Sequence, residues 1–237
     1  MNEQVLKGRV ALITGASRGI GEAVAKAYAR AGAHVVLTAR NTRALESLDD
    51  QIRGEGGTAT LIPLDLLDFA KVDTLGPALA EKFGRLDIFV GNAGMLGTLG
   101  PLGHTDAKEW DQVVGLNLTA NFRLIRTLDP LLRASDAGRV IFVSSSAAEG
   151  YRAYWGAYAA TKAALESLAR TYKSETEQTS IRVNIVDPGK TRTKMRAAAF
   201  PGEKPETLKT PDDITGVFLD LAMPGCSRNG ERLRAQA

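Results

Sequence analysis

The sequence contains very few of the residues that build disulfides and metal sites. Cys226 is the only cysteine among 237 residues, so no internal disulfide can form. The two histidines, His34 and His104, stand far apart in the sequence. Because no cluster of cysteine and histidine is present, neither a structural zinc site nor a Cys–His catalytic pair is supported. We therefore expect a protein that needs no metal.

Long apolar runs and blocks of one charge are also missing. No apolar run approaches the ~18 residues that cross a bilayer, and residues 1–10 carry an early acid where a secretory signal has an apolar core. The net charge is +3, with Lys and Arg interleaved with Asp and Glu, so no basic block indicates a nucleic-acid partner. We expect a cytoplasmic protein without a membrane partner, forming one domain over residues 1–237.

Short apolar runs alternate with helical patterns along the whole chain. This alternation predicts an α/β fold with one parallel sheet covered by helices on both faces. The expected strands are 9–14, 34–38, 58–64, 86–91, 139–143 and 181–186, and the expected helices include 41–54, 68–83, 106–132, 156–177 and 212–222.

A glycine-rich turn, Gly15–Gly21, joins the first expected strand to the first helix. Glycines let backbone N–H groups approach a pyrophosphate, and the helix N-terminus supplies positive potential. The pattern lacks the Gly-Lys-Ser/Thr of a P-loop. The strand–turn–helix setting favours a dinucleotide site over the alternative, a tight turn without a ligand.

The end of the second expected strand indicates which dinucleotide is bound. An NAD site usually places an acid here to hold the ribose 2′-hydroxyl, but the residues are Thr38, Ala39 and Arg40. Arg40 and Arg18, the latter within the glycine turn, could pair with a 2′-phosphate. The sequence therefore predicts NADP over NAD, the alternative being that both arginines are solvated surface residues.

Residues 144–162 begin with three serines and end with Tyr158 and Lys162. The spacing of four places the Tyr and Lys side chains on one helix face. An ammonium beside a phenol is expected to lower the pKa of the tyrosine, which could then exchange a proton with a substrate oxygen held by a serine hydroxyl. An ordinary surface helix is the alternative. Three aromatic residues, Tyr151, Tyr154 and Trp155, lie between the serines and Tyr158. They could contact a planar substrate, or they could make packing contacts equally well.

Residues 188–211 form a long segment rich in Thr, Lys, Arg and Pro that follows the sixth expected strand. Open α/β sheets bind ligands at the carboxyl ends of their strands, and long loops within a compact domain are usually functional. We interpret 190–210 as a mobile substrate lid, the alternative being a disordered excursion.

The ordered set of motifs resembles the short-chain dehydrogenase/reductase family over nearly the whole chain. The resemblance implies a Rossmann fold, a doubly wound sheet of six to seven strands, with NAD(P) and hydride transfer between an alcohol and a ketone. The matching segments are Thr14–Gly21, Asp65, Asn92–Gly94, Asn117, the serine cluster, Tyr158–Lys162 and Asp187–Thr193.

The resemblance also implies catalytic roles. Tyr158 would be the general acid/base, and Lys162 would hold the nicotinamide ribose and lower the tyrosine pKa. Ser145, 13 residues before Tyr158, would bind the substrate oxygen, with Ser144 and Ser146 as second choices. Asn117 would kink its helix and hold a water that continues the proton path to Lys162.

Cofactor contacts follow from the same resemblance. Asp65 would accept a hydrogen bond from the adenine amino group, Asn92 would fix the sheet beside the cofactor, and Thr191 and Thr193 would meet the carboxamide or a phosphate. The full set is Gly15, Ser17, Arg18, Gly19, Ile20, Gly21, Arg40, Asp65, Leu66, Asn92, Ala93, Gly94, Tyr158, Lys162, Pro188, Gly189, Thr191 and Thr193.

Two departures from the family pattern affect these expectations. Gly91 precedes the Asn-Ala-Gly turn where the family often has a second Asn, and after residue 222 only 232–235 can supply a short last strand. The family often builds a tetramer with this end, so we expect a homodimer through the two long helices, or a homotetramer. The predicted function is an NADP-dependent oxidoreductase acting on a small carbonyl or alcohol. The alternative is an NADP-binding sensor or scaffold with little turnover.

Overall fold

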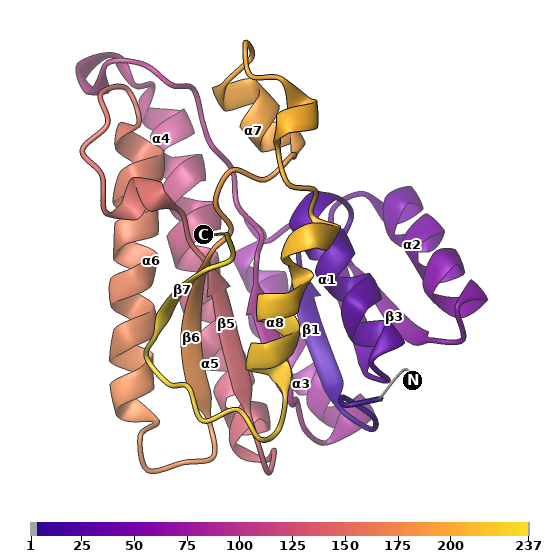
Figure 1. Ribbon diagram of the computed structural model, residues 1–237. Coiled ribbons are helices and arrows are strands. Elements are labelled where there is room, and N and C mark those ends of the chain that lie inside the picture. Colours follow the sequence, from indigo (N-terminus) through magenta and orange to yellow (C-terminus); the bar gives the residue numbers. More distant parts are fainter. Residues whose placement is uncertain (1–3, 237) are drawn as a thin grey trace.

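A seven-stranded parallel sheet forms the centre of the computed structural model, which describes residues 4–236 (Figure 1). The strand order is β3-β2-β1-β4-β5-β6-β7. The strands are β1 Val10–Thr14, β2 His34–Ala39, β3 Thr58–Pro63, β4 Ile88–Gly91, β5 Arg139–Val143, β6 Arg182–Asp187 and β7 Arg232–Arg234.

Helices cover both faces of this sheet. One hydrophobic cluster joins α1, α2 and α8 to the sheet, and a second joins α3, α5 and α6 to its other face. The helices are α1 Gly19–Arg30, α2 Thr42–Gly54, α3 Phe69–Phe83, α4 Ala107–Val114, α5 Ala120–Arg133, α6 Gly156–Glu175, α7 Lys194–Ala199 and α8 Thr215–Ala222.

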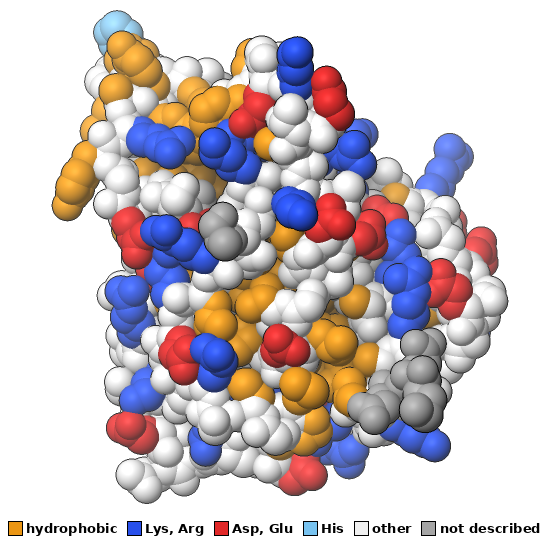
Figure 2. Space-filling view, in the orientation of Figure 1, with side chains coloured by type: hydrophobic (Ala, Val, Ile, Leu, Met, Phe, Trp, Pro, Cys, Tyr) orange, Lys and Arg blue, Asp and Glu red, His pale blue; other side chains and the backbone are white. Residues whose placement is uncertain are grey.

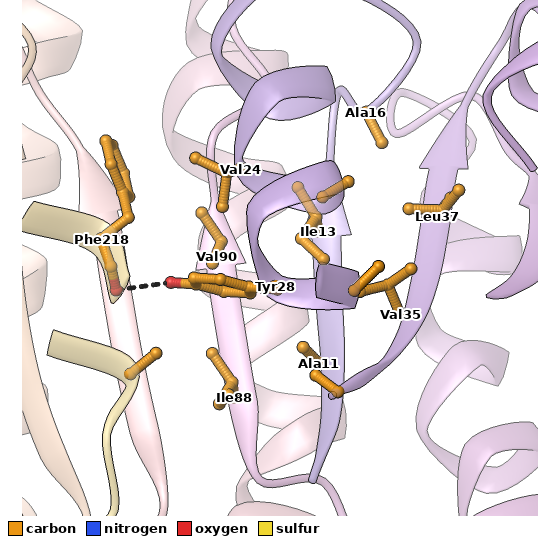
Figure 3. Packing of buried hydrophobic residues seen from close by; sticks show 14 of the residues in the cluster. Ala11, Ile13, Ala16, Val24, Tyr28, Val35, Leu37, Ile88, Val90 and Phe218 are labelled. Atoms are coloured by element: carbon orange, nitrogen blue, oxygen red, sulfur yellow. Dashed lines mark hydrogen bonds between the residues drawn. The ribbon is translucent and has the colours of Figure 1, made fainter. Parts of the chain in front are cut away.

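The β1 strand shows why the apolar runs fold this way. Alternate side chains of a strand point to opposite faces, so Ala11 and Ile13 enter the first cluster while Leu12 enters the second. In the first cluster the buried Tyr28 hydroxyl donates a hydrogen bond to the Phe218 carbonyl at 2.8 Å, linking α1 to α8 (Figure 3). A strand buried on both faces therefore forms a nearly continuous apolar run.

The α/β fold, the doubly wound sheet and the strand positions predicted from the sequence are confirmed. Two segments differ from their predicted form. The expected helix 106–132 is divided by a π-helical turn, Gly115–Thr119. The expected loop 190–210 contains α7, which begins where the Thr193 hydroxyl accepts a hydrogen bond from the Arg196 backbone N–H at 3.1 Å, and a further single turn at Pro205–Thr207.

The chain reverses its direction across the sheet between β1 and β4. The first three strands proceed outward from β1, whereas β4 lies on the other side of β1. Such a reversal leaves a crevice at the carboxyl ends of the two strands. The glycine turn and the Asn-Ala-Gly turn both begin at this edge. Among residues 4–236, no helix combines the length and apolar character needed to cross a membrane.

Candidate active site

The turn after β1 contains glycines at positions where a side chain would be strained or would clash with neighbouring atoms. Gly15 and Gly19 have φ angles of +65° and +61°, which favour glycine. Gly21 has ordinary angles, but a Cβ there would lie 2.4 Å from the Gly15 carbonyl oxygen. Because α1 begins at Gly19, its unpaired first-turn N–H groups lie at this turn.

Gly21→Ala is expected to destabilise the fold by about 2–4 kcal/mol, because the added methyl meets backbone rather than a movable side chain. Gly216→Ala in α8 is the matched control, since nothing lies within 4 Å of its added Cβ. That variant should gain up to about 1 kcal/mol from helix propensity. Urea unfolding of both variants measures the difference, and equal stability would contradict the packing role of Gly21.

The Asn-Ala-Gly turn ties the ends of β1 and β4 together. The Asn92 side-chain amide donates to the Thr14 carbonyl at 2.8 Å and to the Gly15 carbonyl at 3.3 Å. The Thr14 hydroxyl accepts from the backbone N–H groups of Asn92 and Ala93 at 2.9 and 3.0 Å. These bonds fix the glycine turn against the neighbouring strand.

The residues predicted to contact the adenosine lie in the glycine turn and just after β2 and β3. The Ala16 N–H donates to the Thr38 carbonyl at 3.2 Å, so the glycine turn runs beside the end of β2. Arg18 lies two residues after Ala16, and Arg40 lies two residues after Thr38. Both arginines are exposed, and among residues 4–236 neither guanidinium pairs with a carboxylate. Asp65 is also exposed and accepts from the Leu67 N–H at 3.0 Å, while Leu66 is buried.

Asn117 lies in the π-helical turn and is fully buried. Its side chain accepts from the Met95 N–H at 2.8 Å and donates to the Met95 carbonyl at 2.9 Å and the Thr161 hydroxyl at 3.0 Å. The side chain therefore joins the loop after β4 to α6. The sequence reasoning missed this clamp and its partner Thr161.

The structure distinguishes the three serines. Ser144 is buried, and its hydroxyl donates to a Glu166 carboxylate oxygen at 2.6 Å. Ser146 is exposed at the start of a single helical turn. The Ser145 hydroxyl accepts from the Ala147 N–H at 3.2 Å and lines a cavity of about 350 Å³.

Tyr158 and Lys162 lie one turn apart on α6, and both are buried. The Lys162 ammonium donates to the Val143 carbonyl at 2.8 Å and lies 5.8 Å from the Tyr158 ring centre. Burial lowers the pKa of Lys162 to about 8, against the opposing effect of Glu166.

The expected lowering of the Tyr158 pKa is wrong for the protein alone. Burial raises the pKa of Tyr158 and outweighs the opposing hydrogen bond with Ser145. The ammonium of Lys162 is aimed at the Val143 carbonyl, and desolvation is the larger influence on the phenol.

Aromatic residues from two segments form walls of the cavity. Trp155 precedes α6 and Phe200 follows α7, and their ring centres are 5.7 Å apart. Arg196 stacks on Phe200 and forms a two-pronged pair with Glu203. Figure 2 shows hydrophobic side chains gathered beside α7 with Lys and Arg next to them. The exposed Tyr151 and Tyr154 do not line the cavity.

Residues 188–193 connect β6 to this cavity. Gly189 lines it, and the Thr191 hydroxyl is buried, donating to the Pro188 carbonyl at 2.9 Å and accepting from Gln236 at 3.1 Å. A Cβ on Gly19 would lie 3.6 Å from the Thr193 methyl. The segment therefore reaches back to the glycine turn.

A glycine seam joins the dinucleotide turn to the Tyr–Lys pair. A Cβ on Gly15 would lie 3.0 Å from the Ala93 Cα, and a Cβ on Gly94 would lie 3.2 Å from the Asn117 side-chain oxygen and 3.6 Å from the Lys162 ammonium nitrogen. The glycine turn, the Asn-Ala-Gly turn and α6 therefore pack closely, with no side chain on Gly15 or Gly94 between them.

A family model described as short chain dehydrogenase matches residues 9–204. The chain belongs to the short-chain dehydrogenase family. This short-chain dehydrogenase is 42% identical over 222 residues to the uncharacterized oxidoreductase YciK of Escherichia coli K12, covering 92% of this chain and 88% of that protein. It is 34% identical to the 2,3-dihydro-2,3-dihydroxybenzoate dehydrogenase of Bacillus subtilis 168, covering 93% of this chain and 91% of that protein.

Two solved structures are similar over essentially their full length. A short chain dehydrogenase of Escherichia coli CFT073 complexed with NADPH has a TM-score of 0.96 and 40% identity, covering 100% of both chains. One of Shigella flexneri 2a complexed with NADP has a TM-score of 0.95 and 40% identity, covering 99% of this chain and 100% of that chain. The family predicted from the motifs is thus confirmed, and the chain is an oxidoreductase of this family.

Proposed function

We propose that this enzyme transfers a hydride between NADP(H) and a small carbonyl or alcohol substrate, with Tyr158 as the general acid/base. The observation that carries the proposal is the glycine seam, a series of close contacts that connects a dinucleotide-type turn to the buried Lys162. Ser145 lines the cavity between the end of β5 and α7.

Each catalytic residue has a distinct task in the reduction. When bound, NADPH supplies a hydride to the carbonyl carbon. Ser145 and Tyr158 hydrogen-bond the carbonyl oxygen, and Tyr158 donates its proton to that oxygen. The raised pKa of Tyr158 in the protein alone keeps the phenol protonated for this step.

Lys162 and Asn117 complete the proton path. Lys162 holds the ribose and, with its pKa lowered to about 8, can give a proton near neutral pH to replace the one that Tyr158 loses. The Asn117 clamp on Met95 and Thr161 holds the neighbouring backbone in place for a water on this path.

The exposed arginine pair supports NADP as the cofactor. Arg18 and Arg40 lie at the edge where the 2′-phosphate of the adenosine ribose would lie, and the similar enzymes of E. coli CFT073 and S. flexneri were solved with NADPH and NADP. Asp65 lies on the same side for the adenine. Thr193 and the glycine turn would contact the pyrophosphate.

Arg18→Gln and Arg40→Gln should each weaken NADPH binding about 10-fold or more, since each removes a charged hydrogen-bonding partner of a phosphate. NADH binding should stay unchanged. Arg53→Gln, an exposed arginine at the end of α2 that pairs with Asp49, is the matched control. Fluorescence titration with both nucleotides tests the claim, and NADH binding at least as tight as NADPH in the parent enzyme would contradict it.

The walls of the cavity support a planar substrate. Trp155 and Phe200 can stack on an unsaturated ring or conjugated carbonyl near Ser145. Residues 194–204 form one wall of the cavity, and the Arg196–Glu203 pair supports their role as a lid over the substrate.

We also propose that the enzyme forms a homodimer or homotetramer. The exposed Phe122 on α5 supports a contact between subunits through this helix.

A further inference from the structure

A buried ion cluster lies directly beneath the catalytic loop, centred on Arg232 of β7. The Arg232 side chain is only 10% exposed. Its Nε lies 2.9 Å from Glu166 of α6 and its Nη2 3.1 Å from Asp187 of β6, and both carboxylates are 4% exposed. Its Nη1 lies 3.2 Å from the half-exposed Glu149. Two buried carboxylates therefore share one buried guanidinium.

The cluster holds the backbone that carries the catalytic serine. Arg232 Nη2 donates to the Ser145 carbonyl at 3.2 Å, and Glu166 accepts from the Ser144 hydroxyl at 2.6 Å. On the same loop, Lys162 donates to the Val143 carbonyl. Side chains of α6 and β7 thus fix three consecutive residues at the end of β5.

The cluster also sets the electric field at the proton-transfer pair. Glu166 lies one helical turn beyond Lys162 and raises its pKa, and the charge of Asp187 raises the pKa of Tyr158. Arg232 is the cation between these two carboxylates. Among residues 4–236, the other charged side chains that pair with this cluster are Arg170, 3.2 Å from Glu166, and Arg234, 3.7 Å from Glu149.

We propose that Arg232 is a positioning residue that seats Ser145 and, together with Glu166, sets the proton affinity of the Tyr158–Lys162 pair. The inference rests on the proposed function, because it assigns the cluster to the same catalytic site. The short last strand, β7, would thus act on Ser145 at the end of β5, although β6 lies between these two strands. Arg234 of the same strand is exposed, and the carboxylate that it approaches is Glu149, at 3.7 Å.

Loss of Arg232 and loss of Glu166 should shift the pKa of the Tyr158–Lys162 pair in opposite directions. Removing the positive charge of Arg232 leaves Glu166 and Asp187 less compensated, so protons are held more tightly and the apparent pKa of the pair rises. Removing the negative charge of Glu166 has the reverse effect. A purely structural role for both residues would slow the enzyme in both variants without opposite shifts.

The test is a titration of Tyr158 in the complex with NADP⁺. Tyrosinate absorbance is followed against pH for each variant, with the same variant carrying Tyr158→Phe as the blank. Arg232→Gln should raise the Tyr158 pKa by about half a unit or more, and Glu166→Gln should lower it by a similar amount. Arg234→Gln removes the same charge from an exposed site of the same strand and should leave the pKa unchanged.

Two further variants keep the test decisive. Arg232→Lys retains the charge and should restore the pKa, while its loss of the two-pronged geometry weakens the hold on Ser145 and raises KM for a test aldehyde such as benzaldehyde. If Arg232→Gln does not fold, Arg232→Gln/Glu166→Gln removes one charge of each sign and should fold with a pKa near that of the parent enzyme.

The outcomes separate the two proposals. Shifts in one direction, or no shift in Glu166→Gln, would overturn the role of the cluster even if the enzyme is active. Opposite shifts in a protein that oxidises no NADPH with any carbonyl would support the cluster while contradicting the proposed function.

Discussion

Tyr158→Phe is expected to lower kcat for NADPH-dependent carbonyl reduction by about 10³-fold. The change removes only the hydroxyl that we propose as the proton donor to the substrate oxygen, and a positioned acid contributes about 10²–10⁴-fold to such a step. The ring, its edge contact with Trp155 and its burial are retained. Steady-state kinetics with an aromatic aldehyde measure the effect.

The control for this substitution is Tyr151→Phe. Tyr151 lies in the loop before α6, is fully exposed and does not line the cavity, so its loss should leave kcat unchanged. NADPH should still bind to both variants because neither hydroxyl contributes to the glycine turn. Turnover of Tyr158→Phe near that of the parent enzyme would refute the assignment of the general acid.

Lys162→Met is expected to abolish most activity while making the fold more stable at neutral pH. Activity should fall by about 10²-fold or more because the substitution removes the ammonium that we propose to hold the ribose and supply the proton. Stability should rise by about 2 kcal/mol, since a lysine whose burial lowers its pKa from 10.5 to about 8 is a buried charge that costs free energy below pH 8. The lost hydrogen bond to Val143 offsets part of this gain.

The pH dependence of this difference has a definite sign. Between pH 8 and about 10.5 the unfolded chain binds the Lys162 proton and the folded chain does not, so the stability contribution of this group rises with pH. The advantage of Lys162→Met should therefore shrink across this window. Urea unfolding of both proteins at pH 7 and pH 9.5 measures it, and a variant less stable than the parent at pH 7 would contradict the burial cost.

The layered fold was predictable because its strands are short and apolar on both faces. The run at residues 139–143 folds as β5 with the same bounds, and the helix begun at Gly156 is likewise observed. Local periodicity determines such elements. Periodicity could not predict the π-helical turn around Asn117, where the family resemblance implied a kink, because the turn depends on bonds from Asn117 to Met95 and Thr161 in other segments.

Charges in the interior were the least predictable part of the site. Glu166 follows Lys162 by four residues, so its position on the same helix face could have been read from the sequence. Arg232 could not, because only the pairing of β7 with β6 brings it to Ser145. The direction of the Tyr158 pKa shift was predicted wrongly. The sequence spacing shows that a lysine is near, but it does not show how deeply the phenol is buried.

The most direct test of the account is a single-turnover experiment. Stoichiometric NADPH is bound to the enzyme and mixed with a panel of aromatic aldehydes, ketones and quinones, and its absorbance is followed over time. We expect oxidation of the bound NADPH by at least one carbonyl, and its loss in Tyr158→Phe. Tight NADPH binding with no oxidation by any member of the panel would contradict catalysis and favour an NADP-binding sensor or scaffold.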